Sequence, residues 1–167
     1  MEGSVVLDAE TKVAESPDSH KDELRLWLRM LACTTLIERV VRRRLHERFA
    51  VTLPRFDLMA QLDRAGKGMT LGELSRRMMV TNGNVTGLVE RLVEEGLLSR
   101  RQAQEDRRAH IVRLTEKGRR QFRKMANVHE QWIADLFTGL SKDEVEKLLL
   151  LLGKAKASAQ RAAGEKS

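Results

Sequence analysis

The sequence predicts a mainly α-helical fold that carries one small β-hairpin. Apolar side chains recur every three or four residues through most of the 167-residue chain, which is the period of an amphipathic helix. Residues 98–114 instead hold two short runs that alternate apolar and polar side chains, as half-buried strands do. Ser or Thr precedes four of the periodic segments at a position that can cap a helix, so the elements can be delimited in order.

The first helix is predicted to be long. Neither Pro nor Gly occurs between Asp18 and Leu53, and Leu24, Leu28 and Leu31 lie at helical spacing. About 28 residues of helix extend for about 42 Å, which is longer than a small core can bury. The apolar face of such a helix needs a partner, and a second copy of the chain would supply one.

Three shorter helices are predicted in the middle of the chain. Pro54 suits the first turn of one of them. Thr70 and Glu73 form a capping box that starts the next, and Thr81 can cap the third. Gly96 ends the third helix as a left-handed residue. The second and third of these helices are close enough in sequence to form a helix-turn-helix.

A basic hairpin follows the helix-turn-helix. Its strands are predicted at Leu98–Gln102 and His110–Leu114, and a charged tip at Ala103–Ala109 joins them. Residues 97–124 hold ten Lys or Arg against three acids, a net charge of +7 that equals the charge of the whole chain. We therefore predict a winged helix-turn-helix, and the location of the charge indicates an anionic partner.

Two further helices close the chain. Thr115 can cap a helix that runs to about Phe137, and Ser141 with Glu144 forms a capping box for the last one. The Ala- and Lys-rich end after Lys154 is expected to fray.

The predicted domain organisation has three parts. Residues 1–20 form a flexible N-terminal tail, and residues 53–114 form the winged helix-turn-helix DNA-binding domain. Residues 21–52 and 115–160 form the dimerisation helices, so we expect a homodimer.

The second helix of the helix-turn-helix is expected to enter the major groove of double-stranded operator DNA. Its N-terminal face is small and polar, which suits a groove about 12 Å wide, and its two glycines permit close approach. Arginines of the wing would enter the narrow minor groove, with Asp106 orienting one of them. The alternative is a capping loop and an exposed charged turn that bind nothing. The predicted DNA-binding residues are Thr81, Asn82, Gly83, Asn84, Thr86, Arg91, Arg100, Arg101, Arg107 and Arg108.

Three motifs carry a resemblance to a known family. They are Val85–Leu92 with Glu95-Gly96-Leu97, then Asp106-Arg107-Arg108, then Leu114-Thr115-Glu116-Lys117-Gly118. With these motifs the sequence resembles the MarR family of bacterial transcription regulators over residues 24–155. The resemblance implies a triangular homodimer whose two winged domains bind a pseudo-palindromic site. It also implies a repressor that is released by a small ligand bound between the dimerisation region and the winged domain.

The expected effector is an aromatic acid or its acyl-CoA thioester, because residues 81–91 resemble those of regulators of aromatic-acid breakdown. The candidate ligand-binding residues combine aromatic, Met and His side chains, which suit a flat ligand, with arginines for its carboxylate or phosphates. They are Trp27, Met30, Arg39, Arg43, Phe56, Met59, Met125, His129 and Trp132. Core packing and a solvated basic face are the alternatives for these residues.

Other function classes find no support in the sequence. It holds no Gly-x-Ser-x-Gly, no phosphate-binding Gly-rich loop and no His-Glu-x-x-His, so no enzyme is expected. The four His show no paired spacing, so we expect neither a metal nor another cofactor. We see no signal peptide and no membrane span, and the single cysteine precludes an internal disulfide, which fits the cytoplasm.

Three alternative functions stay open. A sequence-tolerant architectural DNA-binding protein would carry the same charge but have no effector. A redox-sensing regulator would use Cys33, although we expect this thiol to be buried and inert. A helical interaction protein that merely carries a basic hairpin would not bind DNA.

Overall fold

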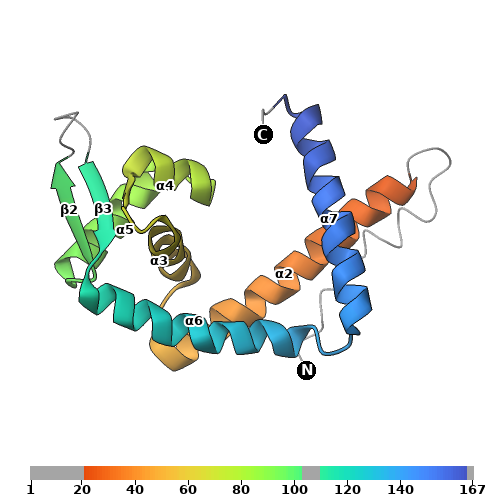
Figure 1. The fold of residues 1–167 in the computed structure, drawn as a ribbon, viewed down its shortest axis with the longest axis horizontal. Coiled ribbons are helices and arrows are strands. Elements are labelled where there is room, and N and C mark those ends of the chain that lie inside the picture. The colour runs from red at the N-terminus through yellow and green to blue at the C-terminus, as the bar shows by residue number, and fades with distance from the viewer. Residues whose placement is uncertain (1–20, 103–109, 165–167) are drawn as a thin grey trace, which may run out of the picture. The chain divides into compact units, whose positions relative to one another are not determined.

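The predicted fold class is confirmed: the protein is mainly helical with a small antiparallel sheet. The computed structural model describes residues 21–102 and 110–164 (Figure 1). The elements are α2 (Lys21–Phe49), α3 (Leu53–Ala65), β1 (Met69–Thr70), α4 (Leu71–Met78), α5 (Asn82–Glu94), β2 (Leu98–Gln102), β3 (His110–Leu114), α6 (Glu116–Leu136) and α7 (Lys142–Ala162). The described residues divide into two compact units, one ending at His129 and one beginning at Glu130, and α6 continues across that boundary.

The sheet has three strands in the order β1-β3-β2, and both pairs are antiparallel. The hairpin strands β2 and β3 have the predicted bounds and lie between α5 and α6 in the chain (Figure 1). The sequence analysis missed β1, in which Met69 pairs with Val112 and Thr70 with Ile111. Two residues are too short for an alternating pattern, so only the pairing with β3 makes this segment a strand.

The core of the first unit lies between its helices and the sheet. Buried apolar side chains from every helix of that unit meet there, which fixes α5 against the elements that surround it. The most deeply buried are Leu45 of α2, Leu58 of α3, Leu74 of α4, Val85 and Leu92 of α5, Val112 of β3 and Met125 of α6.

Local capping signals set most helix ends as predicted. The side-chain oxygen of Thr70 accepts a hydrogen bond from the backbone N–H of Glu73, and the Glu73 carboxylate accepts one from the backbone N–H of Thr70. Ser141 and Glu144 form the same capping box at α7. Hydrogen bonds from the backbone lower the pKa of both Glu carboxyls, because they stabilise the charged form.

Two expectations outside the core are wrong. We predicted fraying after Lys154, but α7 continues to Ala162 because Ala and Lys are strong helix formers and no Gly or Pro interrupts residues 154–162. We expected a buried Cys33, but its thiol is exposed because it lies on the uncovered part of α2.

Large apolar side chains are exposed on α2 and on α7. Leu24, Leu26 and Trp27 of α2 are about half exposed, at 45–53%. On α7, Leu149, Leu150 and Leu151 are 60–66% exposed. No helix within residues 21–102 and 110–164 is long and apolar enough to cross a bilayer. The exposed Leu and Trp side chains give the faces of α2 and α7 the composition of a protein interface.

Candidate nucleic-acid interface

Helix α5 has one buried face and one open face. Val85, Val89 and Leu92 are all buried, and their spacing of four and three residues places them on one side of the helix. The opposite side of the first two turns is centred on Gly83 and Gly87. A Cβ atom added at either glycine would meet no atom within 4 Å, so neither glycine is required by packing. The backbone of α5 is thus accessible to a partner at this face.

Polar groups flank the two glycines. Asn84 is exposed and lies beside them, and Arg91 lies two turns further along the same flank. Glu90 is also exposed and follows Gly87 on the open face. A carboxylate repels phosphate, so the open face itself suits DNA only over the first two turns of α5, whereas Arg91 lies on the flank and not on that face.

The first turn of α5 differs in two details from the prediction. Thr81 is the N-cap residue and is exposed, but its side chain makes no capping hydrogen bond. The Thr86 hydroxyl donates a hydrogen bond of 2.9 Å to the backbone oxygen of Asn82. The Thr86 hydroxyl proton is therefore used within the helix, and a partner would meet mainly its methyl group and oxygen lone pairs. Asn82 and Gly83 are exposed as expected.

The hairpin presents its two predicted arginines on opposite faces. Arg100 and Arg101 are both exposed on β2, but successive side chains of a strand point to opposite sides. Arg101 shares its side with Arg113 of β3, which is exposed and pairs with Ser99. Only one of the two predicted arginines can therefore face a given groove, and Arg113 is an additional basic residue that we did not predict. Asp106, Arg107 and Arg108 lie outside the described residues.

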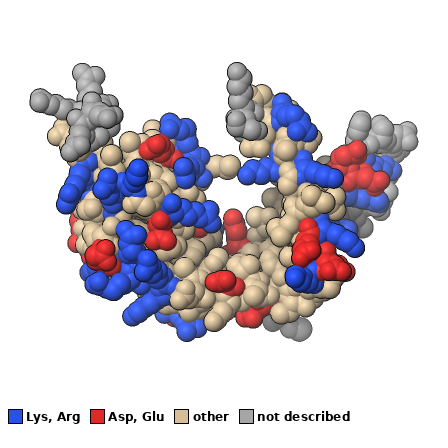
Figure 2. All heavy atoms as spheres, viewed as in Figure 1, with Lys and Arg blue, Asp and Glu red and all other residues tan. Residues whose placement is uncertain are grey.

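Further basic residues lie on α4, which precedes α5. Arg76 and Arg77 are exposed in its last turn, where they also favour the negative end of the helix dipole. In helix-turn-helix proteins the first helix crosses the DNA backbone, so this position suits phosphate contacts. Figure 2 shows Lys and Arg side chains gathered over the part of the molecule that contains α4, α5 and the hairpin.

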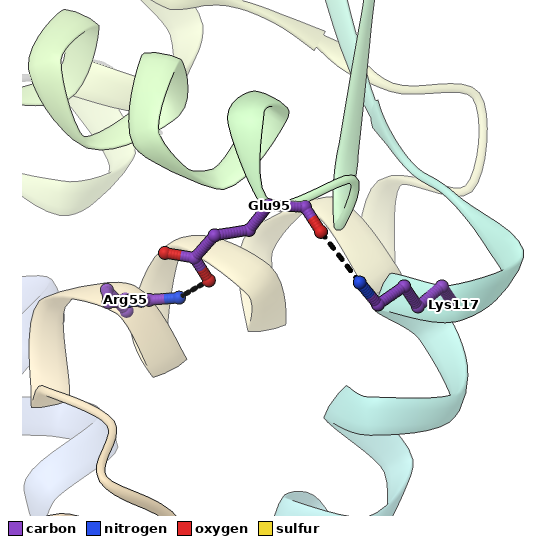
Figure 3. Close-up of polar contacts among 3 residues, drawn as sticks. All are labelled: Arg55, Glu95 and Lys117. Atoms are coloured by element: carbon purple, nitrogen blue, oxygen red, sulfur yellow. Dashed lines mark hydrogen bonds and ion pairs between the residues drawn. The ribbon is translucent and has the colours of Figure 1, made fainter.

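The C-terminal end of α5 is fixed by side chains from two other helices (Figure 3). The guanidinium of Arg55 on α3 donates a hydrogen bond to the carboxylate of Glu95. The ammonium of Lys117 on α6 donates to the backbone oxygen of the same residue at 2.8 Å. Glu95 therefore connects α5 to both α3 and α6. The sequence analysis did not identify this junction, because Arg55 and Glu95 are 40 positions apart.

The turn that follows α5 explains the Leu-Thr-Glu-Lys-Gly motif. Gly96 is left-handed with φ of 70°, and the backbone N–H of Leu97 donates to the oxygen of Leu92 at 2.9 Å, which is a Schellman ending. The Thr115 hydroxyl donates to the oxygen of Gly96 at 2.8 Å and accepts from the backbone N–H of Gly118 at 3.0 Å. A Cβ atom on Gly118 would lie 2.0 Å from the oxygen of Leu97, so only glycine fits there. The motif thus joins the start of α6 to the end of α5.

Four of the predicted ligand residues lie in the first unit on α3 and α6, namely Phe56, Met59, Met125 and His129. The ring of Phe56 on α3 is 4.7 Å from that of His129 and 5.5 Å from that of Phe122, measured between centroids. Met59 and Met125 are fully buried. Burial lowers the pKa of His129 because it disfavours the charged imidazolium. The aromatic, Met and His side chains suit a flat ligand, but the burial of Met59 and Met125 is also that of ordinary core residues.

The other predicted ligand residues lie in different parts of the chain. Trp27 is 53% exposed on α2 and Met30 is partly exposed, while Trp132 is buried in the second unit. Arg39 and Arg43 instead line a separate pocket on α2. Within the described parts of the chain, no group of three or more His, Cys, Asp or Glu side chains could hold a metal ion.

Comparison with known proteins places this arrangement in a family. The model of the MarR family matches residues 51–110, which include α3, α4, α5 and β2. A MarR family transcriptional regulator from Silicibacter pomeroyi is 32% identical, and its crystal structure aligns over 85% of this chain and 99% of that chain with a TM-score of 0.67. The chain belongs to the MarR family.

Two further proteins extend the comparison. The HTH-type regulator YkoM of Bacillus subtilis is 38% identical over 85 residues, which are 51% of this chain and 55% of that protein. The chain thus spans little more than half the length of this curated relative. A mutant MarR from E. coli, solved in complex with operator DNA, has the same fold at 24% identity, with a TM-score of 0.70 over 83% of this chain and 99% of that chain.

Proposed function

We propose that this MarR family protein is a sequence-specific DNA-binding transcriptional regulator that acts in the cytoplasm as a homodimer. The observation that carries the proposal is the open face of α5, where Gly83 and Gly87 expose backbone beside Asn84. Neither glycine is needed for packing, and each costs helix stability relative to Ala, by about 1 kcal/mol in a helix interior. Close approach to a major groove accounts for both residues.

In the proposed complex some residues contact base edges and others contact phosphates. Asn84 binds an adenine edge through its amide, and Arg91 on the same flank binds a phosphate. Asn82 and Thr81 contact the DNA backbone at the start of α5, and the methyl of Thr86 meets a thymine methyl. The wing reaches the minor groove through Arg101, together with Arg107 and Arg108, while Arg100 on the other face of β2 contacts a phosphate. Asp106 orients one of the tip arginines.

Dimerisation is proposed to occur through the apolar faces of α2 and α7. Both helices expose several large apolar side chains, which a second copy would cover. Two recognition helices related by a two-fold axis then bind half-sites about one helical turn of DNA apart. Bound across a promoter, such a dimer excludes the transcription machinery, so we propose a repressor.

For the effector we propose an aromatic acid or an aromatic acyl-CoA thioester. The cluster of Phe56, His129, Met59 and Met125 supports this class, because flat rings stack on Phe and His while Met adapts its shape. Trp27 and Met30, which belong to the same unit, would extend the site. The neutral form of His129, which burial favours, leaves one ring nitrogen as an acceptor for a protonated ligand group.

The test of DNA binding starts from a random duplex pool, from which the full-length protein selects its preferred sequence. We expect the protein to bind that sequence about 10³-fold more tightly than random DNA. Asn84→Ala should reduce this preference, with little loss of binding to random DNA. Arg161→Ala, which removes an exposed cation on α7, serves as the control and should behave like wild type.

Two results would overturn the proposal. An equal affinity of the wild-type protein for selected and random DNA would indicate an architectural DNA-binding protein. Absence of DNA binding would indicate an interaction protein. The effector is tested by calorimetry with benzoate, other aromatic acids and benzoyl-CoA, and then by release of the selected DNA. Failure of every compound to bind would refute the effector class while leaving DNA binding intact.

A further inference from the structure

A pocket of about 520 Å³ opens along the C-terminal half of α2. Arg39, Arg42, Arg43, His46 and Glu47 line its sides. Val51 and Thr52, which connect α2 to α3, also line it, and the side chain of Val51 is buried. The pocket lies entirely within the first unit and does not include the residues of the Phe56 cluster.

The cations in this pocket outnumber the acids. Arg39, Arg42 and Arg43 recur at three and four residues, so like charges are neighbours on one face of α2, where His46 also lies. Such neighbours repel one another and destabilise the helix unless an anion lies between them. Glu47 is the one acid that lines the pocket.

The existing ion pairs do not neutralise this face. Arg42 approaches Glu38 at 3.8 Å, but Glu38 does not line the pocket. Burial and the charge of Glu38 raise the pKa of Asp57 on α3, and the charge of Arg42 partly offsets this by lowering it. In the described ranges neither Arg39 nor Arg43 forms an ion pair with an acidic side chain. Two guanidinium groups of the pocket are therefore available to a ligand.

We propose that this pocket binds a small molecule that carries two or more negative charges at one end, namely a phosphate ester or diphosphate. A planar guanidinium binds two oxygens of a phosphate at once, so adjacent guanidiniums match the several oxygens of such a group. A single carboxylate would satisfy only one of them. The Thr52 hydroxyl adds a hydrogen-bonding group, and Val51 supplies an apolar wall for the body of the ligand.

The pocket is also placed where a ligand would affect the recognition helix. The backbone oxygen of Thr52 accepts hydrogen bonds from the N–H groups of Arg55 and Phe56, both at 3.1 Å, and so starts α3. Arg55 in turn binds Glu95 at the end of α5. A ligand that shifts Thr52 would therefore also shift Arg55, which binds the end of α5. This regulatory step rests on the proposed function, whereas the binding site does not.

Calorimetry on the full-length protein at constant ionic strength tests the site, with pyrophosphate and ADP as probes and benzoate as a monoanionic comparison. We expect ADP and pyrophosphate to bind at least about tenfold more tightly than benzoate. The double variant Arg39→Gln/Arg43→Gln should lose at least about tenfold in affinity for both probes. Arg161→Gln removes an exposed cation from α7 and should bind them as wild type does. Thermal unfolding of both variants verifies that they fold.

Several outcomes would overturn the site. Equal probe affinity in the double variant and the wild type would show that binding occurs elsewhere. No binding of either probe would refute the anion class. If the double variant instead weakens the dimer or the binding of DNA without any probe, the anion is an acidic side chain of a second copy or a DNA phosphate. If the wild-type protein binds the probes but does not bind DNA, the proposed function is refuted and the anion site is retained.

Discussion

Arg55 on α3 is bound to Glu95, the residue at the end of α5. The pair connects the helix that carries Phe56 to the helix that presents Asn84 and the two open glycines. Lys117 binds the backbone oxygen of Glu95 as well, so the carboxylate and the carbonyl of a single residue set the position of α5 relative to α3 and α6. This junction connects the candidate effector cluster to the candidate DNA-binding face.

A double-mutant cycle with Arg55→Met and Glu95→Gln measures the strength of that connection. The two side chains are 22% and 44% exposed, so we expect a coupling free energy of about 1 kcal/mol in urea unfolding. The control cycle uses Arg42→Met and Glu38→Gln, whose side chains are 59% and 55% exposed and 3.8 Å apart. Its coupling should be smaller, about 0.3 kcal/mol. Equal couplings in the two cycles would show that the Arg55–Glu95 pair has no special role in stability.

The close approach of α6 to the turn after α5 predicts a severe effect of Gly118→Ala. The new Cβ would lie 2.0 Å from the oxygen of Leu97, so backbone must shift, and we expect a loss of about 3 kcal/mol in the free energy of unfolding. Gly153→Ala in α7 is the matched control, because a Cβ there meets nothing within 4 Å. That variant should gain up to about 1 kcal/mol. A mild effect of Gly118→Ala would contradict the packing described for this turn.

Gly87→Ala separates stability from function on α5. The added methyl enters open space inside a helix, so the midpoint of thermal unfolding should rise, with a gain of about 0.5–1 kcal/mol. The same methyl would obstruct close approach to a major groove, and we expect the affinity for the selected DNA to fall by about tenfold. Gly139→Ala, in the turn before α7, also adds a Cβ to open space and should leave DNA affinity unchanged. Unchanged DNA affinity in Gly87→Ala would show that this face does not enter the groove.

The sequence predicted those features that depend on residues close together in the chain. The Thr70–Glu73 capping box, the left-handed Gly96 and the hairpin strands each follow from neighbours within a few positions. The features that were missed depend on distant partners. Strand β1 exists because Met69 pairs with Val112, and Arg55 is fixed by Glu95. Periodicity and capping rules carry no information about such pairs.

The candidate site shows the same division. The polar start of α5 and the basic hairpin were evident from residue types, but their orientation was not. The alternation of β2 places Arg100 and Arg101 on opposite faces, and the register with β3 adds Arg113 beside Arg101. The charge repeat of Arg39 and Arg43 was visible in the sequence, yet only the fold shows that they share a pocket with His46 and Thr52.

His129 predicts how stability changes with pH. Burial lowers the pKa of its imidazole in the folded protein, so the unfolded chain binds a proton more readily than the folded one. The contribution of His129 is therefore fully present above the unfolded pKa of about 6.5. It is lost progressively as the pH falls from that value toward the lowered pKa of the folded state. We expect the urea midpoint of the wild-type protein to be lower at pH 5.5 than at pH 7.5.

The variant His129→Phe isolates this effect. In the wild type the His129 and Phe56 ring centroids are 4.7 Å apart, and Phe keeps a ring at this position but cannot take up a proton. Its urea midpoint should change less between pH 7.5 and 5.5 than that of the wild type. His46→Gln removes an exposed imidazole from α2 and serves as the control for the loss of a histidine as such. If His129→Phe and the wild type lose the same stability on acidification, another group must be responsible, and the imidazole of His129 is not held neutral by its burial.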